Sequence, residues 1–155
     1  MKLRAIIIDD EFASRETLQN YLTKYCPDVE VLAQADGIKT GLEAIKKYEP
    51  DVIFLDVEMP YGNAFDLLEQ AGDITFETIF VTAYSHYALK ALNFSAAYYL
   101  LKPIDIDELI TAVEKIKTEK LKDKYEIHTK ILVENIHNAN KQLHKIVLPL
   151  MEGFE

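Results

Sequence analysis

The 155-residue sequence has no tryptophan, one cysteine, and only five glycines and five prolines. Such low glycine and proline contents argue against a low-complexity chain. The lone Cys26 excludes a disulfide within the chain and fits a reducing compartment. The longest apolar run, residues 96–101, has six residues, whereas a membrane-spanning helix needs about 20. Acids directly follow Ile6–Ile8, unlike in a signal or transit peptide. The sequence therefore predicts a cytoplasmic protein without membrane contact.

Positive charge is scarce as well. Lys and Arg number 17 against 26 Asp and Glu, so the net charge is −9. This acidic balance argues against the chain binding nucleic acid or an anionic membrane by itself. Residues 1–120 hold 12 basic and 21 acidic side chains, whereas residues 121–155 hold five of each. The break predicts an acidic domain over residues 1–120, followed by a segment of a different kind.

Five short apolar runs recur along the first 120 residues: 3–8, 29–33, 52–55, 78–81 and 97–101. Most are apolar throughout, as in strands of a parallel sheet that is covered on both faces. Helical patterns lie between them, for example over residues 12–25, where apolar side chains recur every three or four positions. The alternation predicts an α/β fold, a doubly wound five-stranded parallel sheet.

Helix boundaries follow from capping residues. Asp36 is the expected N-cap of the second helix, and that helix should end before Pro50. Asp105 and Glu108 have the spacing of a capping box and predict the start of the last helix.

Polar side chains stand where four of the predicted strands end. Asp9 and Asp10 follow the first, Asp56 the third, Thr82 the fourth and Lys102 the fifth. In doubly wound sheets these carboxyl ends meet at one edge, where ligands bind. Clustered carboxylates without histidine or cysteine suit Mg²⁺, a lysine and a hydroxyl can contact phosphate oxygens, and a carboxylate can accept a phosphoryl group. Each residue alone has a simpler explanation, since Asp9 or Asp10 could cap a helix, but the matched set favours a phosphoryl site on Asp56.

Four segments together resemble the receiver domain of two-component response regulators: residues 8–11 (IDDE), 55–60 (LDVEMP), 81–83 (VTA) and 101–103 (LKP). Their order and spacing match over about 120 residues. The resemblance implies a flavodoxin-like fold and phosphorylation by a sensor histidine kinase.

The resemblance also implies a role for each site residue. Asp56 is the phospho-acceptor, and Mg²⁺ is held by Asp10, Asp56 and the backbone carbonyl of Glu58, with Asp9 completing the acidic pair. Thr82 and Lys102 contact the phosphate. Tyr99 is the aromatic side chain that turns inward when Thr82 moves toward the phosphate.

Two departures from the family pattern stand out. Ala64 occupies a place where glycine is usual, so we expect Gly62 to make the turn instead. Tyr98 replaces an acid and adds to a group of tyrosines around the last two strands, which predicts an aromatic partner surface.

Residues 58–60 (EMP), 87–92 (YALKAL) and 99–103 (YLLKP) further resemble LytTR-type regulators of the LytR/AlgR group, which carry a C-terminal DNA-binding domain. Residues 145–155 look like the first strand of such a domain, so we expect a truncated output domain, with a short natural tail as the alternative. Residues 121–144 predict a linker helix, which packs either on its own receiver or on a second copy, with disorder in the absence of the output domain as a third alternative. The predicted homodimer uses this helix or the face made by strand 4, helix 4, strand 5 and helix 5.

Two rival functions remain open on the sequence. An aspartyl-phosphate phosphatase or phosphotransferase also uses an acid two residues after its nucleophile, the place of Glu58, but about 120 residues leave little room for a substrate pocket. A degenerate receiver that only binds a partner would not need all of the acidic, hydroxyl and lysine positions. We therefore expect a signalling receiver and not an enzyme.

Overall fold

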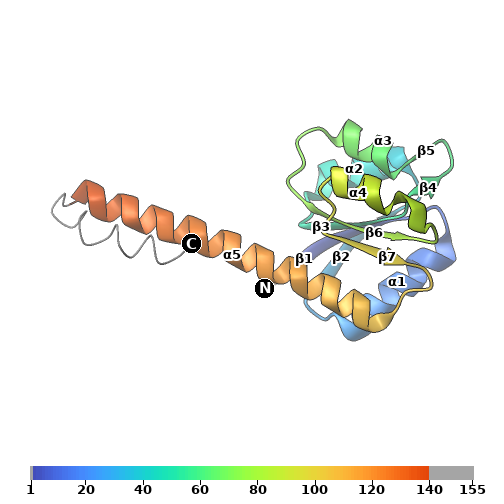
Figure 1. Ribbon diagram of the computed structural model, residues 1–155, viewed down its shortest axis with the longest axis horizontal. Helices are drawn as coiled ribbons and strands as arrows, with labels where there is room; N and C mark the ends of the chain where they lie inside the picture. Colours follow the sequence, from blue (N-terminus) through green and yellow to red (C-terminus); the bar gives the residue numbers. More distant parts are fainter. Residues whose placement is uncertain (1, 140–155) are drawn as a thin grey trace. The chain divides into compact units, whose positions relative to one another are not determined.

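The computed structural model describes the backbone of residues 2–139 and their side chains outside 124–128 and 134–139. Five parallel strands form one sheet in the order β2-β1-β3-β6-β7 (Figure 1). The strands are β1 (Leu3–Ile8), β2 (Val29–Ala35), β3 (Val52–Leu55), β6 (Glu77–Thr82) and β7 (Tyr98–Leu101). A separate antiparallel pair, β4 (Glu58–Met59) and β5 (Gly62–Asn63), follows β3. The predicted doubly wound, flavodoxin-like sheet is confirmed.

Helices cover both faces of this sheet (Figure 1). They are α1 (Phe12–Tyr25), α2 (Ile38–Tyr48), α3 (Ala64–Ala71), α4 (Ala88–Asn93, after a 3₁₀ turn at Ser85–Tyr87) and α5 (Ile106–Ala139). The predicted bounds of the first helix, residues 12–25, are confirmed. Within residues 2–139, no helix combines the length and apolar character that crossing a membrane requires.

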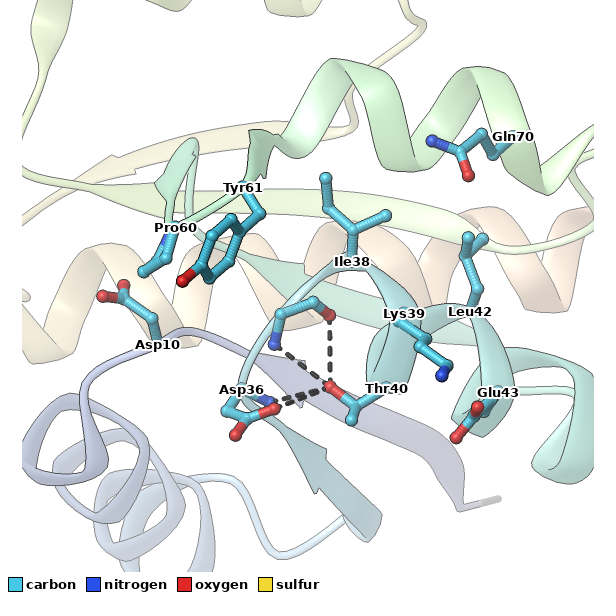
Figure 2. A pocket seen from close by; sticks show the side chains of 11 residues that line it. Asp10, Asp36, Ile38, Lys39, Thr40, Leu42, Glu43, Pro60, Tyr61 and Gln70 are labelled. Carbon is cyan, nitrogen blue, oxygen red and sulfur yellow. Dashed lines mark hydrogen bonds between the residues drawn. The ribbon is translucent and has the colours of Figure 1, made fainter.

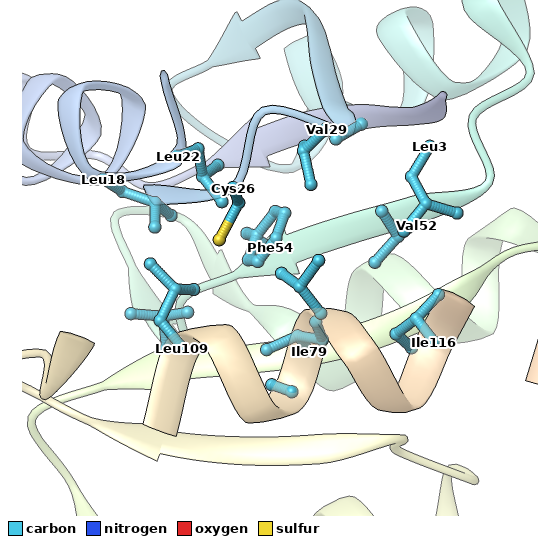
Figure 3. Close-up of a cluster of buried hydrophobic side chains, with 14 of the residues drawn as sticks. Leu3, Leu18, Leu22, Cys26, Val29, Val52, Phe54, Ile79, Leu109 and Ile116 are labelled. Carbon is cyan, nitrogen blue, oxygen red and sulfur yellow. The ribbon is translucent and has the colours of Figure 1, made fainter. Parts of the chain in front are cut away.

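Alternate residues of each strand supply two separate cores, which explains the uninterrupted apolar runs. Leu3, Ala5 and Ile7 of β1 face a core shared with α1 and the start of α5, and Ile6 and Ile8 face one shared with α2, α3 and α4. The first core also contains the only thiol, that of Cys26, which is 5% exposed (Figure 3). Two-sided burial fixes the sheet in position, and with it the edge where the strand ends meet.

Helix α5 belongs to two compact units. The first unit ends at Lys117, and in it the amide of Glu108 donates to Asp105 Oδ1 at 3.1 Å, as the capping spacing predicted. The second unit begins at Thr118, and the helix continues in it to Ala139. The segment predicted to start an output domain, residues 145–155, and the end of the predicted linker helix lie outside the described residues.

The capping prediction for α2 is wrong by one residue. The cap is Gly37, and the hydroxyl of Thr40 accepts from its amide at 3.1 Å. The Thr40 hydroxyl also donates to Asp36 Oδ1 at 2.8 Å, so the carboxylate of Asp36 is used one residue before the cap. Neither Asp9 nor Asp10 caps α1, because Glu11 takes that position without a side-chain hydrogen bond. Asp9 Oδ1 instead accepts from the Glu11 amide at 2.9 Å, just before the helix, and both carboxylates remain at the edge of the sheet.

Gly62 makes the turn before α3, as expected, with a φ of +145°. A Cβ there would overlap Cδ1 of Ile38 in addition to straining the backbone. We expect Gly62→Ala to lower the free energy of unfolding by about 1–3 kcal/mol, measured by urea denaturation. In an Ile38→Val background Cδ1 is absent, so Gly62→Ala should lower the free energy of unfolding by less than it does in the wild type. An unchanged Gly62→Ala variant would contradict the described turn.

Candidate functional site

Three aspartates lie together at the carboxyl edge of the sheet. Asp9 follows β1 and Asp56 follows β3, and these strands are neighbours with Ile8 paired to Leu55. One carboxylate oxygen from each of Asp9, Asp10 and Asp56 lies within 4.8 Å of the others. Asp9 and Asp56 are buried, and Asp10 is half-buried. The topology thus confirms that the strand-end acids form one cluster.

Lys102 reaches this cluster from the end of β7, the outermost strand on that side of the sheet. Its Nζ lies 2.7 Å from Asp9 Oδ2, 3.1 Å from Asp56 Oδ2 and 3.3 Å from Ser14 Oγ. The strand register holds it there, since the Lys102 amide donates to the Thr82 carbonyl at 2.8 Å just after Thr82 pairs with Leu101. One ammonium group therefore bridges the carboxylates from two strands.

The protonation of the cluster follows from burial and charge. Burial raises the pKa of the Asp56 carboxyl, and it outweighs the opposing effects of the Lys102 charge and the Thr82 hydroxyl. For Lys102, burial lowers the pKa, but the hydrogen bond to Asp9 and the charges of both aspartates outweigh it and raise the pKa. Lys102 is therefore charged at neutral pH, whereas ionised Asp56 opposes folding.

The raised pKa of Asp56 gives a pH-dependent stability. The stability that Asp56 contributes is fully present below the pKa of an unfolded aspartate, about 3.9. It is lost as the pH rises through the higher pKa that Asp56 has in the folded protein. Without added metal, Asp56→Asn should therefore melt a few degrees above the wild type at pH 7, where about 1 kcal/mol corresponds to roughly 4 °C. The difference should shrink toward pH 4. A mutant that is less stable at both pH values would show that the ion pair with Lys102 outweighs burial.

The carboxylate set fits Mg²⁺. Three aspartates offer only oxygen donors, which Mg²⁺ prefers, and a single lysine leaves them with excess negative charge. The side chains of Asp9, Asp10 and Asp56 could hold the ion together with a carbonyl from the chain after β3.

Thr82 and Tyr99 lie next to the acids, and a hydrogen bond between the Thr82 hydroxyl and the Asp56 carboxyl opposes the rise in the pKa of Asp56. Thr82 is completely buried, and its hydroxyl accepts from the Tyr84 amide at 3.4 Å. The Tyr99 hydroxyl donates to the Tyr84 carbonyl, and its ring stacks on Phe80 with centroids 5.8 Å apart. Burial, followed by the charge of Asp56, raises the pKa of Tyr99. Both predicted switch residues therefore contact the same short loop after β6.

Glu58 enters the site by a contact that the sequence did not predict. Its side chain is exposed, and the Tyr87 hydroxyl donates to Oε1 at 2.7 Å. The hydrogen bonds from Tyr87 and Tyr84 lower the pKa of Glu58 below its ordinary value. The only signal for this contact was the tyrosine group after β6, which we interpreted as a partner surface.

Two depressions border Asp10. A groove of about 780 Å³ passes Asp10, Pro60 and Tyr61 and continues along the start of α2 (Figure 2). Asp36, just before α2, also lines it and accepts a hydrogen bond from the Thr40 hydroxyl. A second, of about 450 Å³, is lined by Asp10, Glu58 and Tyr87 together with Met59, Pro60, Gly62 and Asn63. The acidic edge is thus open to small molecules and to a partner surface.

Known proteins match both the sequence and the fold. Residues 5–114 match the family described as the response regulator receiver domain. An uncharacterized response regulatory protein of Vibrio cholerae is 37% identical over 147 residues, which is 94% of this chain and 61% of the relative. The sensory transduction protein LytT of Bacillus subtilis is 31% identical over 153 residues, 97% of this chain and 59% of the relative.

A solved structure gives the same result. The REC domain of AraT, a response regulator from Geobacillus stearothermophilus, has a TM-score of 0.70 at 30% identity and covers 81% of this chain and 99% of that domain. The chain spans about three-fifths of the length of the curated relatives quoted above.

Proposed function

Because the chain belongs to the response regulator receiver family of two-component systems, we propose that it accepts a phosphoryl group on Asp56 from a sensor histidine kinase. The observation that supports this most directly is the contact of one ammonium group, that of Lys102, with both Asp9 and Asp56. In the proposed transfer, a carboxylate oxygen of Asp56 attacks the phosphorus of a phosphohistidine. A P–O bond forms, the P–N bond breaks, and the imidazole leaves and takes a proton from solvent.

Each site residue has a defined task in this proposal. Lys102 neutralises a phosphoryl oxygen, and Thr82 donates a hydrogen bond to another after it turns toward the phosphate. Asp9, Asp10, Asp56 and the Glu58 carbonyl would hold Mg²⁺, which when bound supplies positive charge to the transferring oxygens. A movement of Thr82 is passed on to Tyr99, because the hydroxyl groups of both are hydrogen-bonded to the backbone of Tyr84.

Incubation with Mg²⁺ and acetyl phosphate tests this function against its rivals. Stable incorporation of one phosphoryl group per chain supports a signalling receiver. Continuous release of phosphate would favour the phosphatase or phosphotransferase, and no reaction would favour a module that only binds a partner. The engagement of Glu58 by Tyr87 argues against the enzyme, whose second acid must be free to exchange protons.

We propose a DNA-binding output in a cytoplasmic regulator. The LytT relatives are named sensory transduction proteins, and the chain spans about three-fifths of their length. In the proposal, a receiver over residues 1–120 and a linker helix over 121–144 precede a LytTR-type domain that begins at residues 145–155. The receiver is acidic, so the output domain would supply the basic surface that contacts DNA.

Phosphorylation is proposed to create a homodimer through the face of β6, α4, β7 and the first part of α5, which are the fourth and fifth strands of the sheet and the helices after them. Leu89 is 80% and Leu92 67% exposed there, and such patches mark partner surfaces. Beryllofluoride, which mimics the acylphosphate, should tighten dimerisation at least about tenfold in sedimentation experiments, and Leu92→Glu should abolish this gain. A dimer that ignores beryllofluoride, or that is lost only on removal of residues 121–155, would move the interface to the linker helix.

A further inference from the structure

A hydrogen bond joins two loops that lie 29 residues apart in the chain. Glu58 stands in β4, two residues after Asp56, and Tyr87 ends the 3₁₀ turn that leads into α4. The Tyr87 hydroxyl donates to Glu58 Oε1 at 2.7 Å. A carboxylate acceptor makes this bond stronger than one between neutral groups. The loop after the proposed acceptor is thereby tied to the segment that carries α4.

The Tyr87 end of this bond is anchored by aromatic packing. The ring of Tyr87 is half-buried, and its centroid lies 6.0 Å from that of the buried Phe65 ring in α3. The exposed ring of His86 lies 4.1 Å from it, again between centroids. The ring of Tyr84 adds an edge contact at 6.2 Å. These contacts restrict the ring of Tyr87, so its hydrogen bond connects Glu58 to the turn before α4.

The Glu58 end lies at the acidic cluster. Glu58, Tyr87 and Asp10 line the same depression of about 450 Å³. Asp10 in turn shares the carboxylate cluster with Asp9 and Asp56. A cation held there with the Glu58 carbonyl would fix the backbone of Glu58, and its side chain would transmit that constraint to Tyr87.

We propose that the Glu58–Tyr87 hydrogen bond couples cation binding at the aspartate cluster to the order of residues 84–93. Glu58 and Tyr87 are positioning residues in this scheme, and the route is separate from the one through Thr82 and Tyr99. The inference rests on the proposed function, which identifies the cluster as a Mg²⁺ site. Because coupling between two sites is reciprocal, whatever holds α4 in place also strengthens cation binding.

Titration of the whole chain with MgCl₂, followed by backbone amide NMR, tests the coupling. In the wild type, amides of residues 84–93 should shift with the same apparent Kd as amides beside Asp56. Tyr87→Phe removes a single hydroxyl without altering charge, and it should raise the Kd about threefold to tenfold and markedly reduce the shifts in 84–93, with the Tyr84 hydrogen bond to Glu58 as the remaining link. Tyr25→Phe, at the far end of α1, is the matched control and should behave like the wild type.

A double-mutant cycle separates coupling from other effects. Glu58→Ala should also raise the Kd, partly through its lost charge, but Tyr87→Phe should then add nothing. Glu58→Gln keeps an acceptor oxygen and should restore part of the response of residues 84–93. Additive effects, or a Tyr87→Phe variant with wild-type Kd and wild-type shifts, would overturn the coupling while leaving the proposed function intact. A wild type that neither binds Mg²⁺ nor becomes phosphorylated would overturn both.

Discussion

Asp56→Asn is expected to reduce phosphorylation by acetyl phosphate to the background of untreated protein. The amide has no carboxylate oxygen to attack phosphorus, and it replaces the buried acid that contacts Lys102 at 3.1 Å with a side chain of the same shape. Intact-protein mass spectrometry after treatment measures the result as loss of the species heavier by one phosphoryl group.

Asp73→Asn is a suitable control for that experiment. Asp73 is an exposed acid in the loop after α3, and the variant carries the same change in composition and charge. It should be phosphorylated at the wild-type level. If instead Asp56→Asn were labelled as fully as the wild type, the acceptor would be another residue, and the role of Lys102 would need a different explanation.

Asp10→Asn should weaken Mg²⁺ binding about 10-fold to 100-fold, because it removes one of three carboxylates from the cluster. Phosphorylation by acetyl phosphate should fall in parallel and recover at high MgCl₂. The metal-free variant should be at least as stable as the wild type, since repulsion between the carboxylates is relieved. Calorimetric titration and thermal melts with and without Mg²⁺ measure these effects.

Asp36→Asn provides the comparison for Asp10. Asp36 lines the same groove as Asp10, but its carboxylate is bonded to Thr40. Its replacement should leave Mg²⁺ binding nearly unchanged, so a loss equal to that of Asp10→Asn would indicate a general charge effect. Phosphorylation of the wild type that is indifferent to EDTA would contradict a metal-dependent site altogether.

The sequence was sufficient where one physical rule determined the outcome. Two-sided burial requires uninterrupted apolar strands, so β1 and β3 were found with their described bounds. A parallel sheet gathers its carboxyl ends, so Asp9, Asp56 and Lys102 could be placed together although 93 residues separate the first from the last. The chemistry of the cluster then followed from the residue types.

The parts that the sequence missed depend on side-chain geometry between loops. Ser14, in the first turn of α1, accepts a hydrogen bond from Lys102 at 3.3 Å, a contact between segments 88 residues apart for which the sequence gives no signal. The contact of Tyr87 with Glu58 joins a 3₁₀ turn to the short strand β4, and periodicity and strand order give no signal for it. The cap at Gly37 was missed because Asp36 is the better capping residue by type, and its carboxylate was instead taken by Thr40.

The burial of Cys26 provides a chemical probe of local opening. Its side chain is packed in the core between α1 and α5, and burial, followed by the charge of Glu114, raises the pKa of the thiol. Alkylating reagents require an accessible thiolate, so they can modify this residue only in molecules where the core has opened. The alkylation rate of the unmodified chain therefore measures how often the core that α1 and α5 share with the sheet opens around Cys26. Comparing that rate with and without a bound acylphosphate mimic would reveal whether occupation of the site at Asp56 loosens the packing around Cys26.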